Sequence, residues 1–172
     1  MALFPPGKGG GEGVGVGRKG KGVLIHCFTE GNGLPLGVET TPANGSERAM
    51  VVPLLDGVKV KTGKPGRPPK RVGVVACDKG YDSKEVRKDI RARGSRAQVP
   101  KRVWKGRAKP KGRPIKMDTP RFQAERAFSW FQRKYRRLVV RWERIEACFD
   151  GFLDLAFVHI WLTRILDTRL VG

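Results

Sequence analysis

The sequence is poor in cysteine and in acidic residues, and it lacks a long uninterrupted apolar run. Its three cysteines, Cys27, Cys77 and Cys148, stand far apart and form no CxxC pair. Neither a disulfide framework nor a zinc knuckle is indicated, and without an N-terminal secretory signal we expect a protein of the reducing cytoplasm. The most apolar stretch, residues 150–166, is short for a bilayer and is interrupted by Asp and His, so it predicts a buried helix and no membrane anchor.

The shortage of acids leaves a large excess of positive charge. The 172 residues contain 36 Lys and Arg against 16 Asp and Glu, a formal net charge of +20. This charge favours a polyanion as partner, with nucleic acid ahead of an anionic membrane and a merely soluble surface as the alternative. The length and the 39% hydrophobic content allow one ordinary domain with a core. We expect a cytoplasmic protein associated with the nucleoid.

Residues 1–22 are dominated by glycine and show no apolar periodicity, so we expect a flexible basic arm. Within it, GVGRKGKG at 15–22 follows the phosphate-cradling pattern GxxxxGK up to the Ser or Thr that should come next. Gly22 replaces the hydroxyl that would bind magnesium, and no strand precedes the pattern. Both departures favour a basic loop over a nucleotide site.

Two strand-like runs, 23–29 and 34–41, are joined by EGNG, whose Asn-Gly pair is typical of a tight hairpin with positive φ angles. A helix is predicted to follow, with Ser46 as its cap. Residues 72–77, VGVVAC, predict a strand that is apolar on both faces, as in the centre of a sheet covered on both sides.

The segments that follow alternate between short elements and basic loops. Asp82 and Glu85 have the spacing of a capping box ahead of a charged helix, and RAQVP after that helix predicts an edge strand. Basic loops are expected at 59–71 and at 100–117, because these stretches combine prolines with many lysines and arginines and contain no acid. Strands and helices in this order predict a mixed α/β fold, with a hairpin first and parallel crossovers after it.

Two carboxylates are candidates for metal binding. Asp78 leaves the carboxyl end of the strand 72–77, where ligands bind in open α/β sheets. Glu125 lies on a long helix predicted downstream, and helical spacing places it with apolar side chains toward the core. Such oxygen ligands suit Mg²⁺ or Mn²⁺, which also take phosphate oxygens. Two alternatives stay open: Asp78 caps the next turn, or Glu125 pairs with Arg121 or Arg126.

The predicted helix around Glu125 and its continuation are rich in basic and aromatic side chains. This composition suits a surface that binds the phosphate backbone of a nucleic acid, although a solvated helix face is the simpler alternative. Trp130 and Trp142 are expected in the core, with base stacking as the alternative. The basic candidates for contact with DNA are Arg126, Arg133, Lys134, Arg136, Arg137, Arg141 and Arg144.

Several stretches in combination resemble one family. CDKGYDSKEVRKDIRARG, ERAFSWFQRKYRRLVVRWER and LDLAFVHIWLTRIL are similar to the C-terminal half of bacterial insertion-sequence DDE transposases of the insertion-sequence-five type. HCFTEGNGLPLGVETTPANGSE is similar to the hairpin that precedes it there, so the resemblance covers about residues 7–168. It implies a ribonuclease-H-like mixed sheet with flanking helices. In this fold three acids bind two Mg²⁺ or Mn²⁺ ions that serve to cut transposon ends and join them to target DNA.

The resemblance also implies roles for individual residues. Asp78 matches the second acid of the family and Glu125 the third, so both are implied catalytic residues and metal ligands. Arg121 matches an arginine of the same motif and is an implied DNA contact. Gln132 stands where some relatives carry a lysine, which leaves that DNA contact to Arg133 or Lys134.

The first acid of the family has no counterpart in this sequence. No Asp precedes Asp56, and Glu12 and Glu30 lie outside the expected strand. We therefore expect residues 23–168 to form an N-terminally truncated DDE domain that lacks its first central strand and is inactive alone. Its expected partners are DNA and an intact transposase or a separately encoded N-terminal half. The alternatives are a ribosomal-protein-like nucleic-acid-binding protein without enzymatic activity, and a fragment that represses an intact transposase.

Overall fold

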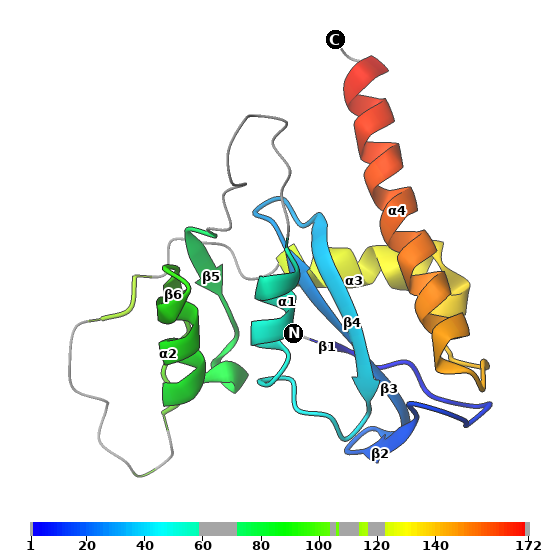
Figure 1. Ribbon diagram of the computed structural model, residues 1–172, viewed down its shortest axis with the longest axis horizontal. Coiled ribbons are helices and arrows are strands. Elements are labelled where there is room, and N and C mark those ends of the chain that lie inside the picture. The colour runs from blue at the N-terminus through cyan, green and yellow to red at the C-terminus, as the bar shows by residue number, and fades with distance from the viewer. Residues whose placement is uncertain (1, 59–71, 104–105, 107–113, 117–122, 171–172) are drawn as a thin grey trace. The chain divides into compact units, whose positions relative to one another are not determined.

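The chain forms two compact units, and the computed structural model describes residues 2–58, 72–103, 106, 114–116 and 123–170 (Figure 1). Unit 1 consists of Met1–Ser46 and Gln123–Gly172, and unit 2 consists of Glu47–Phe122. An antiparallel sheet in unit 1 and a parallel strand pair in unit 2 accompany the helices. The predicted mixed α/β class is therefore confirmed.

The sheet of unit 1 is built around its longest strand. This strand, β3 (Gly20–Thr29), pairs antiparallel with β1 (Ala2–Leu3), β2 (Gly15–Gly17) and β4 (Pro35–Pro42). The pairing of β3 with β4 confirms the predicted hairpin. In its turn Gly33 has a φ of +91°, whereas Asn32 keeps a negative φ, so one glycine is enough to reverse the chain.

Residues 2–22 differ from the predicted flexible arm, because this segment contains β1 and β2 and is paired to β3. The Val23 amide also donates a hydrogen bond to the Pro5 carbonyl oxygen at 3.1 Å. A Cβ on Gly22 would lie only 2.4 Å from that Pro5 oxygen, so glycine is what lets the two backbones approach. Backbone hydrogen bonds to β3 order this segment. Because such bonds involve no side chains, the sequence shows no apolar periodicity from which they could be predicted.

The described helices of unit 1 are α3 (Gln123–Lys134), the 3₁₀ helix η2 (Arg136–Leu138) and α4 (Glu146–Leu170). The long helix predicted to continue toward residue 144 is thus interrupted. Tyr135 leaves helical geometry, with φ −121° and ψ 83°, and η2 follows it. The helices pack on one face of β3 and share with it a core formed by Val23, Ile25, Cys27, Ala127, Phe128, Phe131, Leu138, Phe149, Leu153, Ala156 and Ile160.

Only one face of α4 is buried, although the sequence predicts a buried helix. Phe149 and Leu153 lie in the core, whereas the side chain of Leu155 is 67% exposed, and Val158 and Leu162 are half exposed. Polar contacts also hold the helix to the sheet, since Thr40 Oγ1 donates to an Asp150 carboxylate oxygen at 2.7 Å and the Trp161 indole donates to the Pro35 carbonyl oxygen. Within the described parts of the chain, no helix combines the length and apolar character needed to cross a membrane.

The described elements of unit 2 are α1 (Val51–Gly57), β5 (Val74–Ala76), the 3₁₀ helix η1 (Lys79–Tyr81), α2 (Lys84–Ala92) and β6 (Arg96–Gln98). β5 and β6 pair in parallel, as the order of elements predicts. α1 starts at Val51 and not after the expected cap Ser46, with Pro53 in its first turn, where a missing N–H breaks no helical hydrogen bond. The expected basic loop 59–71 and most of the loop 100–117 lie outside the described residues.

Helix α2 has defined caps at both ends. Its N-cap is Ser83 and not the expected Asp82, because Ser83 Oγ accepts a hydrogen bond from the Val86 amide at 3.3 Å. At the other end Gly94 has a φ of +75°, and the Ser95 amide reaches back to the Ile90 carbonyl oxygen at 3.2 Å. This is the glycine-terminated geometry that ends many helices and turns the chain into β6.

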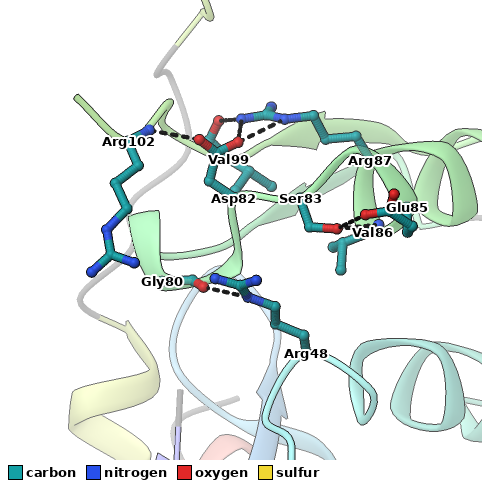
Figure 2. A network of polar contacts seen from close by, with 9 residues as sticks. All are labelled: Arg48, Gly80, Asp82, Ser83, Glu85, Val86, Arg87, Val99 and Arg102. Atoms are coloured by element: carbon teal, nitrogen blue, oxygen red, sulfur yellow. Dashed lines mark hydrogen bonds and ion pairs between the residues drawn. The ribbon is translucent and has the colours of Figure 1, made fainter. Parts of the chain in front are cut away.

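Asp82 instead forms a polar network that ties the start of α2 to the chain after β6 (Figure 2). Arg87 donates to Asp82 Oδ1 through Nη2 at 2.7 Å and also donates to the Val99 carbonyl oxygen at 2.7 Å. The Arg102 amide donates to Asp82 Oδ2 at 2.6 Å. Partial burial raises the pKa of Asp82, but the hydrogen bonds from Arg102 and Arg87 outweigh it and hold the pKa below its ordinary value of 3.8.

The substitution Asp82→Asn should loosen this network, because it removes the charge that Arg87 and the Arg102 amide share. Hydrogen bonds to a charged group contribute about 1–3 kcal/mol, so the Arg102 amide should exchange with deuterium faster than in the wild type at neutral pH. A carboxylate whose pKa is lowered on folding stabilises the fold only while it is ionised. The protection of the wild-type Arg102 amide, measured against the exchange rate of an unfolded peptide at the same pH, should therefore fall as the pH drops below 3.8 toward the lower folded pKa.

The matched control is Asp154→Asn, which removes the same charge from an exposed position on α4 in unit 1. Its exchange at Arg102 should equal that of the wild type. If Asp82→Asn leaves this exchange unchanged as well, Asp82 does not hold the chain after β6.

Candidate functional site

Asp78 lies just beyond the end of β5, as the sequence predicts for a residue at the carboxyl end of a strand. It is exposed and has an extended backbone, with φ −72° and ψ 163°, immediately before η1. Its side chain makes no capping hydrogen bond, and the contact with the turn comes from its backbone carbonyl oxygen, which accepts from the Tyr81 amide at 3.0 Å. The alternative of a capping carboxylate is therefore not supported.

The turn that carries Asp78 is fixed by polar contacts within unit 2. The buried Tyr81 donates its hydroxyl to Glu47 Oε2 at 2.9 Å. Arg48 Nε donates to the Gly80 carbonyl oxygen at 2.8 Å (Figure 2). Burial and then the negative charge of Glu47 raise the pKa of Tyr81, so this hydroxyl stays a donor over the physiological range. The turn on which Asp78 stands is therefore held by two hydrogen bonds, one from the Tyr81 hydroxyl to Glu47 and one from Arg48 to the Gly80 carbonyl oxygen.

Glu125 lies in the first turn of α3 and is exposed. The prediction that it faces the core is wrong. The buried face of α3 runs through Ala127, Phe128 and Phe131, and Ala124 on the same face also packs against the core. Successive residues of a helix are turned by about 100°, so Glu125 lies roughly a quarter turn from Ala124 and points away from this face. The outward direction makes its carboxylate accessible.

The two candidate acids belong to different units, Asp78 to unit 2 and Glu125 to unit 1. Each has an exposed carboxylate, a type of oxygen ligand that Mg²⁺ and Mn²⁺ prefer. Each could be one protein ligand of a cation whose other coordination positions are filled by water and phosphate oxygens. The described residues contain no group of three or more His, Cys, Asp or Glu side chains that could hold a metal ion. Arg121 lies outside the described residues.

Most of the basic candidates are exposed on unit 1, along α3, on η2 and just after it. Arg126 donates to the Asn32 carbonyl oxygen at 3.2 Å. Arg137 pairs with the Glu143 carboxylate at 3.3 Å while 61% of its side chain stays exposed. The exposed members of this basic surface are Arg126, Arg133, Lys134, Arg136, Arg137 and Arg144, and Gln132 is exposed among them. Their cationic groups are available to a polyanion.

Arg141 does not belong to this basic surface, contrary to the prediction of a DNA contact. It is 1% exposed, and its guanidinium donates to the backbone carbonyl oxygens of Glu143 and Glu12. It also lies 5.4 Å from the centroid of the Phe149 ring. Its neighbour Trp142 is 59% exposed, although the sequence predicts a core position. No local sequence pattern predicts that Arg141 is buried and Trp142 exposed, because the guanidinium of Arg141 binds the Glu12 carbonyl oxygen, 129 positions away in the sequence.

Comparison with known proteins gives one consistent result. The family model described as "Transposase DDE domain" matches residues 3–153. A Burkholderia cepacia protein assigned by name as a transposase of insertion sequence element IS402 is 32% identical over 138 residues, which are 80% of this chain and 62% of the relative. A Brucella ovis protein assigned likewise to insertion sequence element IS6501 is 30% identical over 148 residues, which are 80% of this chain and 96% of the relative. No solved structure is significantly similar.

The chain thus spans about three fifths of the length of the first relative and almost all of the second. The predicted resemblance to bacterial insertion-sequence DDE transposases is confirmed, while the insertion-sequence-five type stays a prediction. The family match contains the turn with Asp78, the exposed Glu125 and the basic surface. The match over most of the chain and the two relatives place this protein in the Transposase DDE domain family.

Proposed function

We propose that this protein acts in DNA transposition, in the metal-dependent cleavage of transposon ends and their transfer to target DNA. The observation that carries the proposal is the family match over residues 3–153, which includes an exposed carboxylate at the end of β5. The antiparallel sheet, the parallel strand pair and the flanking helices are compatible with the ribonuclease-H-like fold that we propose for the complete domain.

Asp78 and Glu125 are the proposed ligands of Mg²⁺ or Mn²⁺. Divalent ions, when bound, make a water or a 3′ hydroxyl nucleophilic and stabilise the leaving oxygen of the phosphodiester. The protein contributes two carboxylates on supported stretches of backbone. Asp78 stands on a turn whose backbone is hydrogen-bonded, and Glu125 extends from a helix that is packed on β3. Rigid support of this kind lowers the cost of holding a charged oxygen in place.

The basic surface is the proposed contact with the phosphate backbone of DNA. Its exposed arginines and Lys134 bring several positive charges to α3, η2 and the chain just after it, with the exposed indole of Trp142 nearby in sequence. Phosphate contacts of this kind orient DNA without reading its sequence, so they suit both transposon ends and target sites. Arg121, in the same family motif, is a further proposed contact.

A third carboxylate is required for the proposed chemistry, and we propose that it comes from outside these 172 residues. No Asp precedes Asp56. Of the early glutamates, Glu30 is already used in the hairpin turn, where its Oε1 accepts from the amides of Asn32 and Leu34 at 2.8 and 3.1 Å. We therefore propose that the chain by itself does not cut DNA and that its partner is a separate polypeptide or an intact transposase that supplies the first acid and its strand.

Metal binding tests the two proposed ligands without requiring activity. In the wild-type chain, electron paramagnetic resonance should detect weak Mn²⁺ binding that Asp78→Asn and Glu125→Gln each reduce, because each removes a charged oxygen ligand. Adding the polypeptide encoded directly upstream should restore Mn²⁺-dependent nicking of the element's ends, and each substitution should lower that nicking by at least about 10²-fold.

The control Asp154→Asn removes an exposed acid from α4 and should leave both measurements unchanged. Nicking that survives both Asp78→Asn and Glu125→Gln would refute the active-site assignment. Salt-dependent DNA binding without nicking under any of these conditions would instead favour a nucleic-acid-binding protein without enzymatic activity.

Salt dependence tests the proposed DNA contact. Affinity for duplex DNA should fall with a slope of log K against log salt near −0.9 per phosphate neutralised. The double substitution Arg136→Ala with Arg137→Ala should make the slope shallower by about 2 if both arginines meet phosphate. The control Lys88→Ala with Arg91→Ala removes the same charge from exposed positions on α2. Equal slopes for the two double variants would show that the contact is not localised on η2.

A further inference from the structure

The glycine segment, residues 6–13, lies along the chain that connects η2 to α4. The Arg141 amide donates to the Pro6 carbonyl oxygen, and the Lys8 amide donates to the Arg141 carbonyl oxygen, both at 2.9 Å. Further along, the Glu12 amide donates to the Arg144 carbonyl oxygen at 2.9 Å. The Gly9 amide adds a longer hydrogen bond to the Arg141 carbonyl oxygen at 3.4 Å. These backbone hydrogen bonds join two stretches from opposite ends of the sequence within unit 1.

The side chain of Arg141 closes this contact. Its Nε donates to the Glu143 carbonyl oxygen at 3.0 Å and its Nη2 donates to the Glu12 carbonyl oxygen, so one guanidinium binds both stretches. The ring of Phe149 covers it at 5.4 Å. Burying a guanidinium is costly unless it is hydrogen-bonded, and removing its partners leaves an uncompensated charge. The glycine segment and Arg141 are thus stable in this position only together.

Steric fit makes the contact specific to glycine. A Cβ on Gly9 would lie 2.0 Å from the Trp142 carbonyl oxygen, and a Cβ on Gly11 would lie 2.1 Å from the Arg144 carbonyl oxygen. Both distances are far below van der Waals contact, and the obstructing atoms belong to the backbone. Any side chain at these positions therefore pushes the glycine segment away from residues 142–144.

The stretch that the glycine segment holds is the one that continues the basic surface. Beyond η2, residues 139–145 form neither an α-helix nor a strand, so their conformation depends on contacts outside the stretch itself. Arg144 is exposed in this stretch, and Arg136 and Arg137 are exposed on η2 directly before it, while Arg141 between them is buried. Ordering such residues costs backbone entropy, and a protein in which they are already ordered does not lose that entropy on binding DNA.

We propose that Arg141 is a positioning residue that, with the glycine segment, preorganises the basic stretch 136–144 for the phosphates of DNA. Arg141 itself touches no phosphate. The inference rests on the proposed DNA binding and deepens it, because it assigns the glycine segment, which otherwise resembles a basic tail, to the support of the DNA contact.

Gly9→Ala is the sharpest test, because it removes no charge and no hydrogen-bonding side chain. The matched control is Gly31→Ala, where a new Cβ meets nothing within 4 Å. Without DNA, the amides of Glu12 and Arg141 should exchange with deuterium faster in Gly9→Ala than in the control. Affinity for duplex DNA should fall on the order of tenfold, and the salt slope should become shallower, because arginines that are no longer held meet phosphate less often.

Arg141→Lys separates positioning from direct contact and covers the case that Gly9→Ala fails to fold. A lysine would preserve a direct phosphate contact, but it cannot reproduce the planar, two-sided binding of the Glu12 and Glu143 carbonyl oxygens. Positioning therefore predicts faster exchange of the Glu12 amide and weaker DNA binding in Arg141→Lys. Wild-type exchange with wild-type affinity in this variant would overturn the inference.

The outcomes also distinguish this inference from the proposed function. A wild-type chain that does not bind DNA would refute the proposed DNA contact, and the positioning role with it. A wild-type chain that binds DNA, with Gly9→Ala binding equally well at the same salt slope, would refute the positioning role alone. Faster amide exchange together with weaker binding in both Gly9→Ala and Arg141→Lys would support it.

Discussion

Backbone pairing along β3 is the constraint on which the rest of unit 1 depends. This strand takes β1, β2 and β4 as hydrogen-bonded partners and places Ile25 and Cys27 against the helices. Burial raises the pKa of the Cys27 thiol to about 12, which reflects how completely this face is removed from water. Because the buried face of α3 must meet β3, its other faces are exposed, and these carry Glu125 and much of the basic surface.

The features that could be predicted are those encoded by neighbouring residues. The Asn-Gly pair with flanking apolar runs indicates the hairpin, and β-branched residues followed by Asp78 indicate a strand that ends at a carboxylate. The structure has both. Periodicity also predicts α3, although its described part starts at Gln123. In each case the signal lies within about ten residues, where local preference and tertiary packing agree.

The features that escaped prediction depend on distant contacts or on single-residue offsets. Glu125 is three residues before Phe128, which suggests a common face, but the buried stripe is centred one residue earlier, on the line through Ala124. Ser83 and not Asp82 is the N-cap of α2, because the Asp82 carboxylate accepts hydrogen bonds from Arg87 and from the Arg102 amide. Arg141 is assigned to the surface by its charge alone, whereas carbonyl oxygens from both ends of the chain bind it.

The steric fit at Gly9 and Gly11 has a consequence at the level of the gene. Every missense change reachable from a glycine codon by one nucleotide introduces a residue with a Cβ atom. At these two positions that atom would meet a backbone oxygen at 2.0 or 2.1 Å. A stretch whose composition resembles low-complexity sequence therefore accepts no side chain at these two positions without a shift of the backbone.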